Sequence, residues 1–407
     1  MKKILALILS LVMALSLVAC GGNGGEDEPS GGEDAKTVKV GLICIGDEND
    51  QGYTYNFIRG KEAATEALAA KGINVEWMVK YNIGEDSSCE DANRELAEEG
   101  CQLIINNSFG FEGHMLKVAP EYPDVQFVSC TNQASRSDDL DNTHNAFANI
   151  YEGRYLAGIV AGMKLQQMID EGTIKADAAK IGYVGAFPFA EVKSGYTAYF
   201  LGAKSVCPSV TMQVKFVNSW SNATEEGNAA SALCDEGCVL ISQHSDNTTP
   251  ATTAQTNKAF HTGYNNDMIG VAPEASLIGT RIDWSVYFSY IIEAVANGEK
   301  FDQDWCHGMD MGAVVMTPLN DKIAAPGTAE KLEEVEKALH DGTLHVFDTS
   351  KFTVDGKAVE HAFALDTDGD FVPDSEEAIS DGYYHESEFQ SAPYFTLDID
   401  GITLDAE

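Results

Sequence analysis

"VKVGLICI", residues 38–45, predicts a buried strand because most of its side chains are apolar and several are β-branched. The polar loop "NDQGYTYNF", residues 49–57, follows it and leads into a helical pattern. Further strands are predicted at residues 73–79, 103–106, 125–129, 181–185, 214–217 and 239–242. Helical patterns lie between them at residues 56–71, 90–99, 113–119, 152–167, 191–205 and 223–236. This alternation predicts an α/β fold with parallel sheets covered by helices on both faces.

The strand–helix pattern occurs twice, over residues 38–129 and again over residues 181–265. We therefore expect two doubly wound sheets, each in its own lobe, with a ligand cleft between them. Ligands of such sheets bind beyond the carboxyl ends of the strands. Five loops occupy that position, at residues 49–57, 106–110, 186–188, 218–220 and 243–246. Most of them carry polar and aromatic side chains, which suit a flat heteroaromatic ligand or ribose-like hydroxyls.

The N-terminus has the pattern of an export signal. Lys2 and Lys3 precede an apolar stretch that ends at Ala19, and Cys20 follows. We expect residues 1–19 to be a signal peptide and Cys20 to carry lipid, because the end of the stretch resembles the lipobox of bacterial lipoproteins. An ordinary signal with a chance cysteine is the alternative. Residues 20–36 are rich in Gly and acids and predict a flexible tether, which would place a lipid-anchored protein on the extracytoplasmic face of the cell membrane.

The charge and the cysteines exclude several classes of protein. The formal net charge is -38, which argues against nucleic acid as a partner because that binding needs Lys and Arg on phosphates. Eight cysteines remain beside Cys20, and their disulfide state is open. Cys234 and Cys238 stand one helical turn apart, but no nearby His or Cys pair completes a zinc site.

Several short motifs identify a family resemblance. They are Asp50-Gln51-Gly52-Tyr53 with Gly60, the run 152–158, the run 181–185, Ser194-Gly195-Tyr196 with Gly202-Ala203, Gln243-His244-Ser245-Asp246, the run 263–268, Ala272-Pro273 and Trp284. Over residues 36–320 the chain resembles the basic membrane protein family of bacterial lipoproteins. This family comprises ABC-transporter substrate-binding proteins of the purine-nucleoside-receptor type.

The resemblance implies a type I periplasmic-binding-protein fold, with two lobes that close on a ligand about a hinge. We expect an N-terminal lobe of residues 37–148 with 264–310, and a C-terminal lobe of residues 149–263 with 311–345. Residues 346–407 form an acidic C-terminal extension. The glycines of the run 152–158 have the spacing of close helix packing, so we interpret that run as structural.

The resemblance also implies a set of ligand-binding residues. The set is Asp50, Tyr53, Thr54, Asn107, Phe109, Phe187, Trp220, Asp246, Asn265, Asp267, Arg281 and Trp284. Tyr53 is expected to stack on the ligand and Asp50 to accept hydrogen bonds from it. Two positions depart from the nucleoside-binding pattern, since Thr54 and Val192 stand where that subgroup has Asn and Phe. Phe187, Trp220 or Trp284 would then supply the second stacking ring, and a free base or another small polar solute remains an alternative ligand.

An acidic loop in the extension has calcium-loop spacing. It places Asp366, Asp368, Asp370, Asp374 and Glu377 at positions 1, 3, 5, 9 and 12. Position 6, usually Gly, is Phe371. A structural Ca²⁺ site and a solvated acidic turn are both compatible with this pattern, and no cofactor is required for solute binding.

Three kinds of function remain. The first is a receptor that delivers its solute to the permease of an ABC importer. An enzyme is the second, but adjacent His244, Ser245 and Asp246 cannot form a relay, which needs partners from separate elements. The third is a surface lipoprotein whose extension binds a partner through Ca²⁺. We expect the receptor and no catalytic activity.

Overall fold

The computed structural model describes residues 36–132, 140–370 and 372–405. The predicted signal peptide, Cys20 and all of the predicted tether except Lys36 lie outside these residues. Residues from Lys36 onward form one compact unit. Within the described part of the chain, no helix has both the length and the apolar character needed to cross a membrane.

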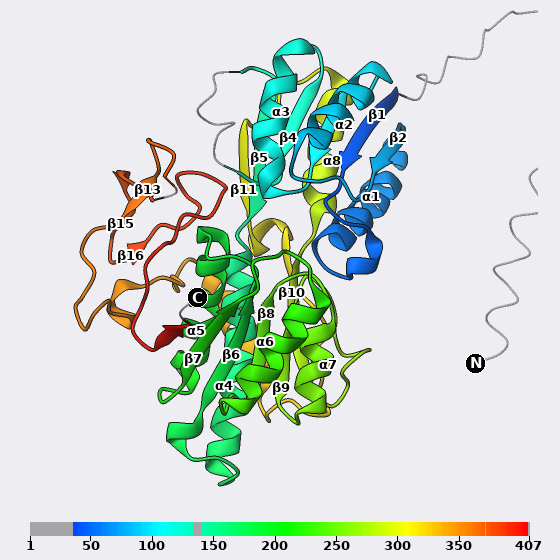
Figure 1. Cartoon of the computed structure of the whole chain (residues 1–407). Coiled ribbons are helices and arrows are strands. Elements are labelled where there is room, and N and C mark those ends of the chain that lie inside the picture. The colour runs from blue at the N-terminus through cyan, green and yellow to red at the C-terminus, as the bar shows by residue number, and fades with distance from the viewer. Residues whose placement is uncertain (1–35, 133–139, 371, 406–407) are drawn as a thin grey trace, which may run out of the picture. The chain divides into compact units, whose positions relative to one another are not determined.

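The N-terminal lobe contains a six-stranded parallel sheet in the order β11-β5-β4-β3-β1-β2 (Figure 1). Its strands are β1 (Lys36–Ile43), β2 (Ile73–Lys80), β3 (Leu103–Asn106), β4 (Gln126–Ser129), β5 (Thr143–Ala148) and β11 (Asp304–His307). Its helices are α1 (Tyr53–Ala69), α2 (Ser87–Glu98), α3 (Glu112–Val118) and α8 (Trp284–Asn297). Helices α1 and α8 cover one face of the sheet, and α2 and α3 cover the other.

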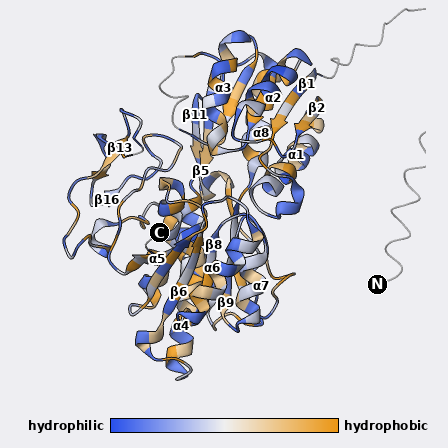
Figure 2. Ribbon diagram, in the orientation of Figure 1, coloured by the Kyte–Doolittle hydropathy of each residue, from blue (hydrophilic) through white to orange (hydrophobic). Residues whose placement is uncertain are grey.

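The alternation of side chains along β1 explains this double coverage. Val40 and Leu42 pack with Phe57 of α1 and Phe288 of α8. Ile43 points to the opposite face and packs with Leu96 of α2 and residues of α3. Figure 2 shows hydrophobic residues along the strands of both lobes, as expected for parallel strands buried on both faces.

The C-terminal lobe contains a seven-stranded sheet in the order β12-β10-β9-β8-β6-β7-β17. Its strands are β6 (Lys180–Gly185), β7 (Thr211–Phe216), β8 (Leu240–His244), β9 (Phe260–Tyr264), β10 (Ser276–Ile282), β12 (Val314–Met316) and β17 (Ile402–Leu404), and only β12 is antiparallel to its neighbour. Its helices are α4 (Ile150–Asp170), α5 (Ala190–Val206), α6 (Ala223–Asp235), α7 (Thr249–Thr256) and α9 (Thr328–His340).

Glycines let helices α4 and α5 cross in backbone contact. A Cβ atom on Gly158 would lie 2.0 Å from the Tyr199 carbonyl oxygen, and one on Gly202 would lie 2.1 Å from the Tyr155 carbonyl oxygen. Only glycine fits at these two positions. The prediction that the run 152–158 serves helix packing therefore agrees with this geometry.

The chain crosses between the lobes three times. The crossings follow β5 near Asn149, β10 near Asp283 and β11 near Gly308. The predicted boundary at residue 264 is wrong, because β10 pairs with β9 in the C-terminal sheet and the chain returns to the N-terminal lobe only at α8. Without a clear periodicity between residues 264 and 284, the sequence pattern could not separate the two lobes here.

The C-terminal extension packs against both lobes. It forms the short pairs β13 (Phe363–Leu365) with β14 (Ser375–Glu377), and β15 (Ile379–Ser380) with β16 (Tyr383–Tyr384), before β17 joins the C-terminal sheet. Ser391 contacts the N-terminal lobe, since its hydroxyl accepts from Asn145 Nδ2 at 2.8 Å and its N–H donates to Asp304 Oδ2 at 3.0 Å. The extension is thus an integral part of the fold.

Short 3₁₀ helices occupy several connections. They are η1 (Glu48–Asp50), η2 (Phe109–Phe111), η3 (Ala119–Glu121), η5 (Ala176–Ala178), η6 (Met309–Met311) and η7 (Thr349–Lys351). The eight cysteines within the described residues are free thiols, and most are buried. They act as small apolar side chains of the core.

Candidate functional site

A small cavity of about 30 Å³ lies between the lobes, at the carboxyl ends of the parallel strands. This volume is far below the roughly 300–1,000 Å³ typical of small-molecule sites, so the lobes must separate to admit such a molecule. The lining consists of Ile45, Tyr53, Asn107, Ser108, Phe109, Cys130, Thr131, Glu191, Trp220, His244, Asp246, Tyr264 and Asn265. Both lobes contribute, so a bound molecule would touch both.

The N-terminal lobe supplies one wall from loops that follow β1, β3 and β4. Asn107 stands directly after β3, and its Oδ1 accepts from the Ile45 N–H at 2.9 Å. Tyr53 begins α1, and its hydroxyl donates to the Cys130 carbonyl oxygen at 3.1 Å. These bonds join three neighbouring loops and fix the positions of the Tyr53 ring and the Asn107 amide.

The C-terminal lobe supplies the facing wall. His244 ends β8, Tyr264 ends β9, and Trp220 follows β7. Glu191 lies in the first turn of α5 and its Oε1 is 3.1 Å from His244 Nε2. The His244 and Tyr264 rings lie with their centroids 4.3 Å apart. The wall therefore combines aromatic faces with a carboxylate and hydroxyl groups.

Asp246 joins the two lobes across the cavity. Its Oδ1 accepts from the Tyr53 backbone N–H of the N-terminal lobe at 3.0 Å and from Asn265 Nδ2 at 3.1 Å. Gly52 lies against it so closely that a Cβ atom would be 2.7 Å from the Asp246 Cα, Cβ and Oδ1 atoms. Asn56 adds a second link, donating to the Asn265 carbonyl oxygen at 2.7 Å. The loop of residues 49–57 therefore holds the lobes together.

The cavity has a negative and largely desolvated lining. Among the described residues the lining includes Asp246 and Glu191 but no Lys or Arg. Burial raises the pKa of Asp246 well above its ordinary value, and the neighbouring Asp50 carboxylate raises it further. Burial also lowers the pKa of His244. These groups suit a neutral or cationic ligand that donates hydrogen bonds, and they disfavour an anionic one.

Two buried oxygens of the lining have no hydrogen-bond partner among the described residues: the Tyr264 hydroxyl and Asn265 Oδ1. Tyr264 is 2% exposed and Asn265 is fully buried. A buried polar group without a partner destabilises the protein by about 1–3 kcal/mol. Such groups at a cavity indicate that a bound molecule supplies the missing hydrogen bonds.

Behind Tyr264 lies the fully buried Arg154 of α4. Its guanidinium lies 5.2–5.3 Å from the ring centroids of Tyr183, Tyr199 and Tyr264, and it donates to the Gly263 carbonyl oxygen at 3.2 Å. Cation–π contacts of this kind stabilise a buried positive charge. Arg154 therefore holds the ring of Tyr264 from behind, although the sequence pattern indicated only packing for its run.

Aromatic rings gather at one end of the cavity. Phe109 of the N-terminal lobe stacks on Phe189 of the C-terminal lobe at 5.2 Å. Phe187 also stacks on Phe189, with the ring centroids 5.0 Å apart, and contacts Trp220 edge-on. Phe109 and Trp220 line the cavity, whereas Phe187 supports them from outside it.

The structure places half of the predicted ligand-binding residues in the lining: Tyr53, Asn107, Phe109, Trp220, Asp246 and Asn265. Asp50 lies outside because its carboxylate accepts from the N–H groups of Gly52, Thr54 and Tyr55 and so caps α1. Thr54 is buried behind the lining and contacts Asn107.

Three other predicted residues lie farther from the cavity lining. Asp267 is exposed, and its carboxylate accepts from the Ile269 N–H. Arg281 pairs with Asp283 at 3.3 Å. Trp284 is fully buried in the core of the N-terminal lobe, where it packs on Phe57. A large aromatic at the start of a helix can serve the core or a site equally well, and the sequence alone could not distinguish them.

Some lining residues were not among the predicted ligand-binding residues: Ile45, Ser108, Cys130, Thr131, Glu191, His244 and Tyr264. His244 and Tyr264 stand at the carboxyl ends of strands, and that position was the available signal. Glu191 comes from a helix, so its place in the lining depends on how the lobes pack.

The acidic loop brings only part of the predicted calcium set together. One carboxylate oxygen from each of Asp366, Asp368 and Asp374 lies within 4.8 Å of the others. Asp370 instead accepts from the Val372 N–H, and Glu377 pairs with His361 at 2.9 Å. Calcium binding by the three converging aspartates stays a prediction.

Comparison with known proteins agrees with this architecture. Residues 37–344 match the sequence model of the Bmp family, described as ABC transporter substrate-binding protein PnrA-like. A purine-binding protein of Brucella abortus is 34% identical over 313 residues, which cover 76% of this chain and 83% of that protein. A candidate glucose-binding protein of an ABC transporter from Haloferax volcanii is 29% identical, covering 82% of this chain and 79% of that protein.

Solved structures resemble the fold at low sequence identity. An ABC transporter solute-binding protein from Aeropyrum pernix superposes with a TM-score of 0.63 at 15% identity, over 76% of this chain and 93% of the other. One from Conexibacter woesei gives 0.57 at 20% identity, over 76% and 98%. These neighbours confirm the predicted type I periplasmic-binding fold. The chain belongs to the Bmp family of ABC-transporter substrate-binding proteins, a family of solute-binding proteins and not of enzymes.

Proposed function

We propose that this protein is the lipid-anchored receptor of an ABC importer and that it binds a purine nucleoside or a related small solute between its lobes. The observation that carries the proposal is the interlobe cavity, where aromatic rings lie beside the partnerless Tyr264 hydroxyl and Asn265 Oδ1. The purine-binding relative from Brucella abortus supports the same ligand class.

The lining suits a planar base with N–H donors. Phe109 and Trp220 offer ring faces, and Asp246, Glu191 and Asn265 offer oxygens that accept hydrogen bonds. The absence of Lys and Arg from the described lining disfavours nucleotides, whose phosphates need positive charge. A nucleoside or a free base therefore fits better than a phosphorylated ligand.

A carbohydrate is the second candidate for the same site. Sugars are also bound by carboxylates, amides and aromatic faces, and the relative from Haloferax volcanii is a candidate glucose-binding protein. In either case the lobes must move apart to admit the ligand, because the cavity between them has a volume of about 30 Å³.

Calorimetric titration tests the proposal. Purified protein, unfolded and refolded to remove carried-over ligand, is titrated with adenosine, guanosine, inosine, cytidine, adenine, ribose and glucose. We expect tight binding of a purine compound without turnover. Binding heat with glucose and with no other compound would favour the carbohydrate. No binding heat with any compound of the panel would exclude these nucleosides and bases as ligands.

Two variants connect the binding to the cavity. Tyr264→Phe removes the partnerless hydroxyl, and Asn265→Ala removes the partnerless amide oxygen. Each is expected to weaken binding about tenfold, because a hydrogen bond to the ligand contributes on the order of 1.4 kcal/mol. Glu62→Ala, on the exposed side of α1, is the matched control and leaves affinity unchanged. Equal affinity in all three variants would place the site elsewhere.

The anchor is tested separately. We expect Cys20→Ser to release the exported protein from the membrane fraction while solute affinity stays the same, because the cysteine precedes in sequence all the residues that form the lobes. Retention of the variant in that fraction would contradict lipidation at this residue.

A further inference from the structure

A second cavity lies where the C-terminal extension packs against the hinge. Its volume is about 120 Å³, and its walls come from the start of α4, the segment that follows α9, and the extension. Glu152 stands at the first turn of α4, directly after the first crossing between the lobes. This cavity is separate from the interlobe cavity, because no residue lines both.

The lining of this hinge cavity carries several acidic side chains. Glu152, Glu386 and Glu388 all line it, and among the described lining residues there is no Lys or Arg. Glu386 is only 2% exposed, its Oε2 accepts from the Tyr394 N–H at 3.4 Å, and its Oε1 has no hydrogen-bond partner among the described residues. A buried carboxylate that lacks a cationic partner is costly in its ionised form.

Burial has a marked effect on two of these carboxyl groups. It raises the pKa of Glu152 to about 7, and it raises the pKa of Glu386 to about 8 although the nearby Ser194 hydroxyl partly offsets this. Glu388 lies at the rim, is more exposed, and pairs with His385 at 2.7 Å. A cation in the cavity would keep Glu152 and Glu386 ionised at neutral pH.

Aromatic faces line the same cavity. Tyr151, Phe347, Tyr383 and Tyr384 contribute to it, and Tyr383 stacks on His345 with the ring centroids 3.7 Å apart. Carboxylates beside aromatic faces are a favourable environment for an organic ammonium group, which gains both ionic and cation–π contacts. An aliphatic stem would pack on the same rings.

A metal ion fits this cavity less well. Metal ligands must converge on one point at short distance. Among the described residues, only Asp366, Asp368 and Asp374 bring three potential ligand atoms within 4.8 Å, and none of these lines the hinge cavity. The carboxylates of the hinge cavity are therefore spread along a space that suits an elongated molecule.

We propose that the hinge cavity is a second binding site, which takes a small aliphatic amine with its ammonium group at Glu386 and Glu388. The site is independent of the solute that binds between the lobes. It touches the hinge directly, because Glu152 Oε2 accepts from the Met309 N–H at 2.8 Å on the third crossing. A bound amine therefore changes the environment of the carboxylate that joins two crossings.

Calorimetry with 1,4-diaminobutane and ethanolamine tests this site, and 1,4-butanediol is the uncharged control of matched length. The diamine is expected to bind with a micromolar to low-millimolar dissociation constant, and the diol to give no heat. Added diamine also raises the unfolding temperature of the purified protein. Absence of heat from both amines would overturn the proposal.

Variants place the amine in the cavity. Glu386→Gln is expected to weaken diamine binding at least tenfold, and Glu388→Gln at the rim weakens it several-fold while leaving the interior intact. Glu334→Gln, on an exposed side chain of α9, is the control for nonspecific attraction to acidic surface and binds the diamine as the wild type does. Equal diamine affinity in Glu388→Gln and the wild type would overturn the assignment, even if Glu386→Gln did not fold.

Discussion

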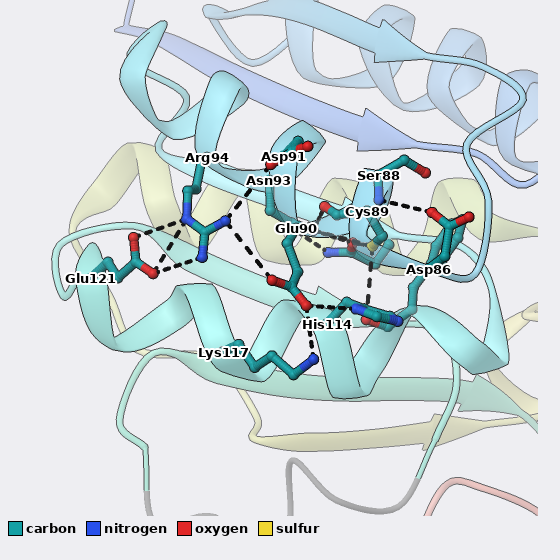
Figure 3. Close-up of polar contacts among 12 residues, drawn as sticks. Asp86, Ser88, Cys89, Glu90, Asp91, Asn93, Arg94, His114, Lys117 and Glu121 are labelled. Atoms are coloured by element: carbon teal, nitrogen blue, oxygen red, sulfur yellow. Dashed lines mark hydrogen bonds and ion pairs between the residues drawn. The ribbon is translucent and has the colours of Figure 1, made fainter.

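The carboxylates on the α2–α3 face of the N-terminal lobe pair with positively charged side chains, whereas those in the interior have uncharged partners. Figure 3 shows Glu90 within reach of Lys117, His114 and Arg94 on this face. The interior carboxylates Asp246 and Glu386 have uncharged partners: backbone N–H groups, the Asn265 amide and the Ser194 hydroxyl. Lys, Arg and His side chains neutralise the surface carboxylate, whereas the interior carboxylates can be neutralised only by a proton or by a bound ligand.

The pKa values follow this difference. Lys117 and then His114 lower the pKa of Glu90 to about 2. Burial raises the pKa of Asp246 and Glu386 instead. The chain has a net charge of -38, so most of its acidic residues say little about function. The few buried carboxylates without a positively charged side-chain partner are the ones that mark candidate binding sites.

The largest expected effect is on the pH dependence of stability. Glu386 has a folded pKa of about 8 against a model value of 4.5, so its contribution to stability is complete below pH 4.5 and is lost as pH rises to 8. Relative to Glu386→Gln, the wild type is expected to lose roughly 3–5 kcal/mol of unfolding free energy across this window. Denaturant titrations at several pH values measure the difference, and a constant difference would contradict the assignment.

The same titrations test the surface side of the comparison. Glu90 has a lowered pKa, so its contribution to stability is present above pH 4.5 and is lost as pH falls toward 2. The difference in stability between Glu90→Gln and the wild type should therefore vary with pH only in that acidic range. The wild type loses stability there as pH falls, whereas in the comparison with Glu386→Gln it loses stability as pH rises. If that difference also varied between pH 5 and 8, the two regions would not differ as described.

A second prediction applies one substitution to both regions. Asp246→Ala is expected to weaken solute binding about 10- to 100-fold, since a hydrogen bond to a charged group contributes about 1.5–3 kcal/mol. Glu90→Ala is the matched control, because its carboxylate lies on the outer face of the N-terminal lobe and its loss leaves affinity unchanged. Calorimetry with the identified solute makes the measurement, and equal losses in both variants would contradict the comparison.

A third prediction concerns the contact that brings Asp246 to the N-terminal lobe. Gly52→Ala places a methyl group against Asp246, where the distances of 2.7 Å leave no room for it. We expect about tenfold weaker solute binding, because overpacking at the contact costs on the order of 1–3 kcal/mol. Gly113→Ala is the control, since a Cβ atom there meets nothing within 4 Å. Unchanged affinity in Gly52→Ala would show that the lobes need not approach this closely to bind solute.

The smallest expected effect concerns the acidic loop. If Asp366, Asp368 and Asp374 bind Ca²⁺, millimolar Ca²⁺ should raise the unfolding temperature by about 1–2 °C relative to chelator. Asp374→Asn should remove the increase, and Asp370→Asn should not. Equal unfolding temperatures in calcium and in chelator, measured by calorimetry, would show that the loop is a solvated turn without bound Ca²⁺.

The sequence predicted the repeating elements more reliably than the site. The apolar run at residues 38–45 and its successors gave strands close to those observed, because parallel strands buried on both faces produce a strong signal. Asp50 shows where this reasoning fails. The sequence correctly predicted that it lies in a loop after a strand, but it could not predict that the carboxylate turns back to cap α1. Glu191 reaches the cavity from a helix, and only the packing of two lobes determines that.

The place of β17 has a consequence for the synthesis of the protein. Residues 402–404 complete the C-terminal sheet by pairing with β7, which lies almost two hundred positions earlier in the chain. Until residues 402–404 are made, β7 is an open edge that can pair with another molecule. The C-terminal sheet therefore reaches its final form only after residues 402–404 have been made, and a chain that stops before them leaves the edge of β7 open to pairing with other molecules.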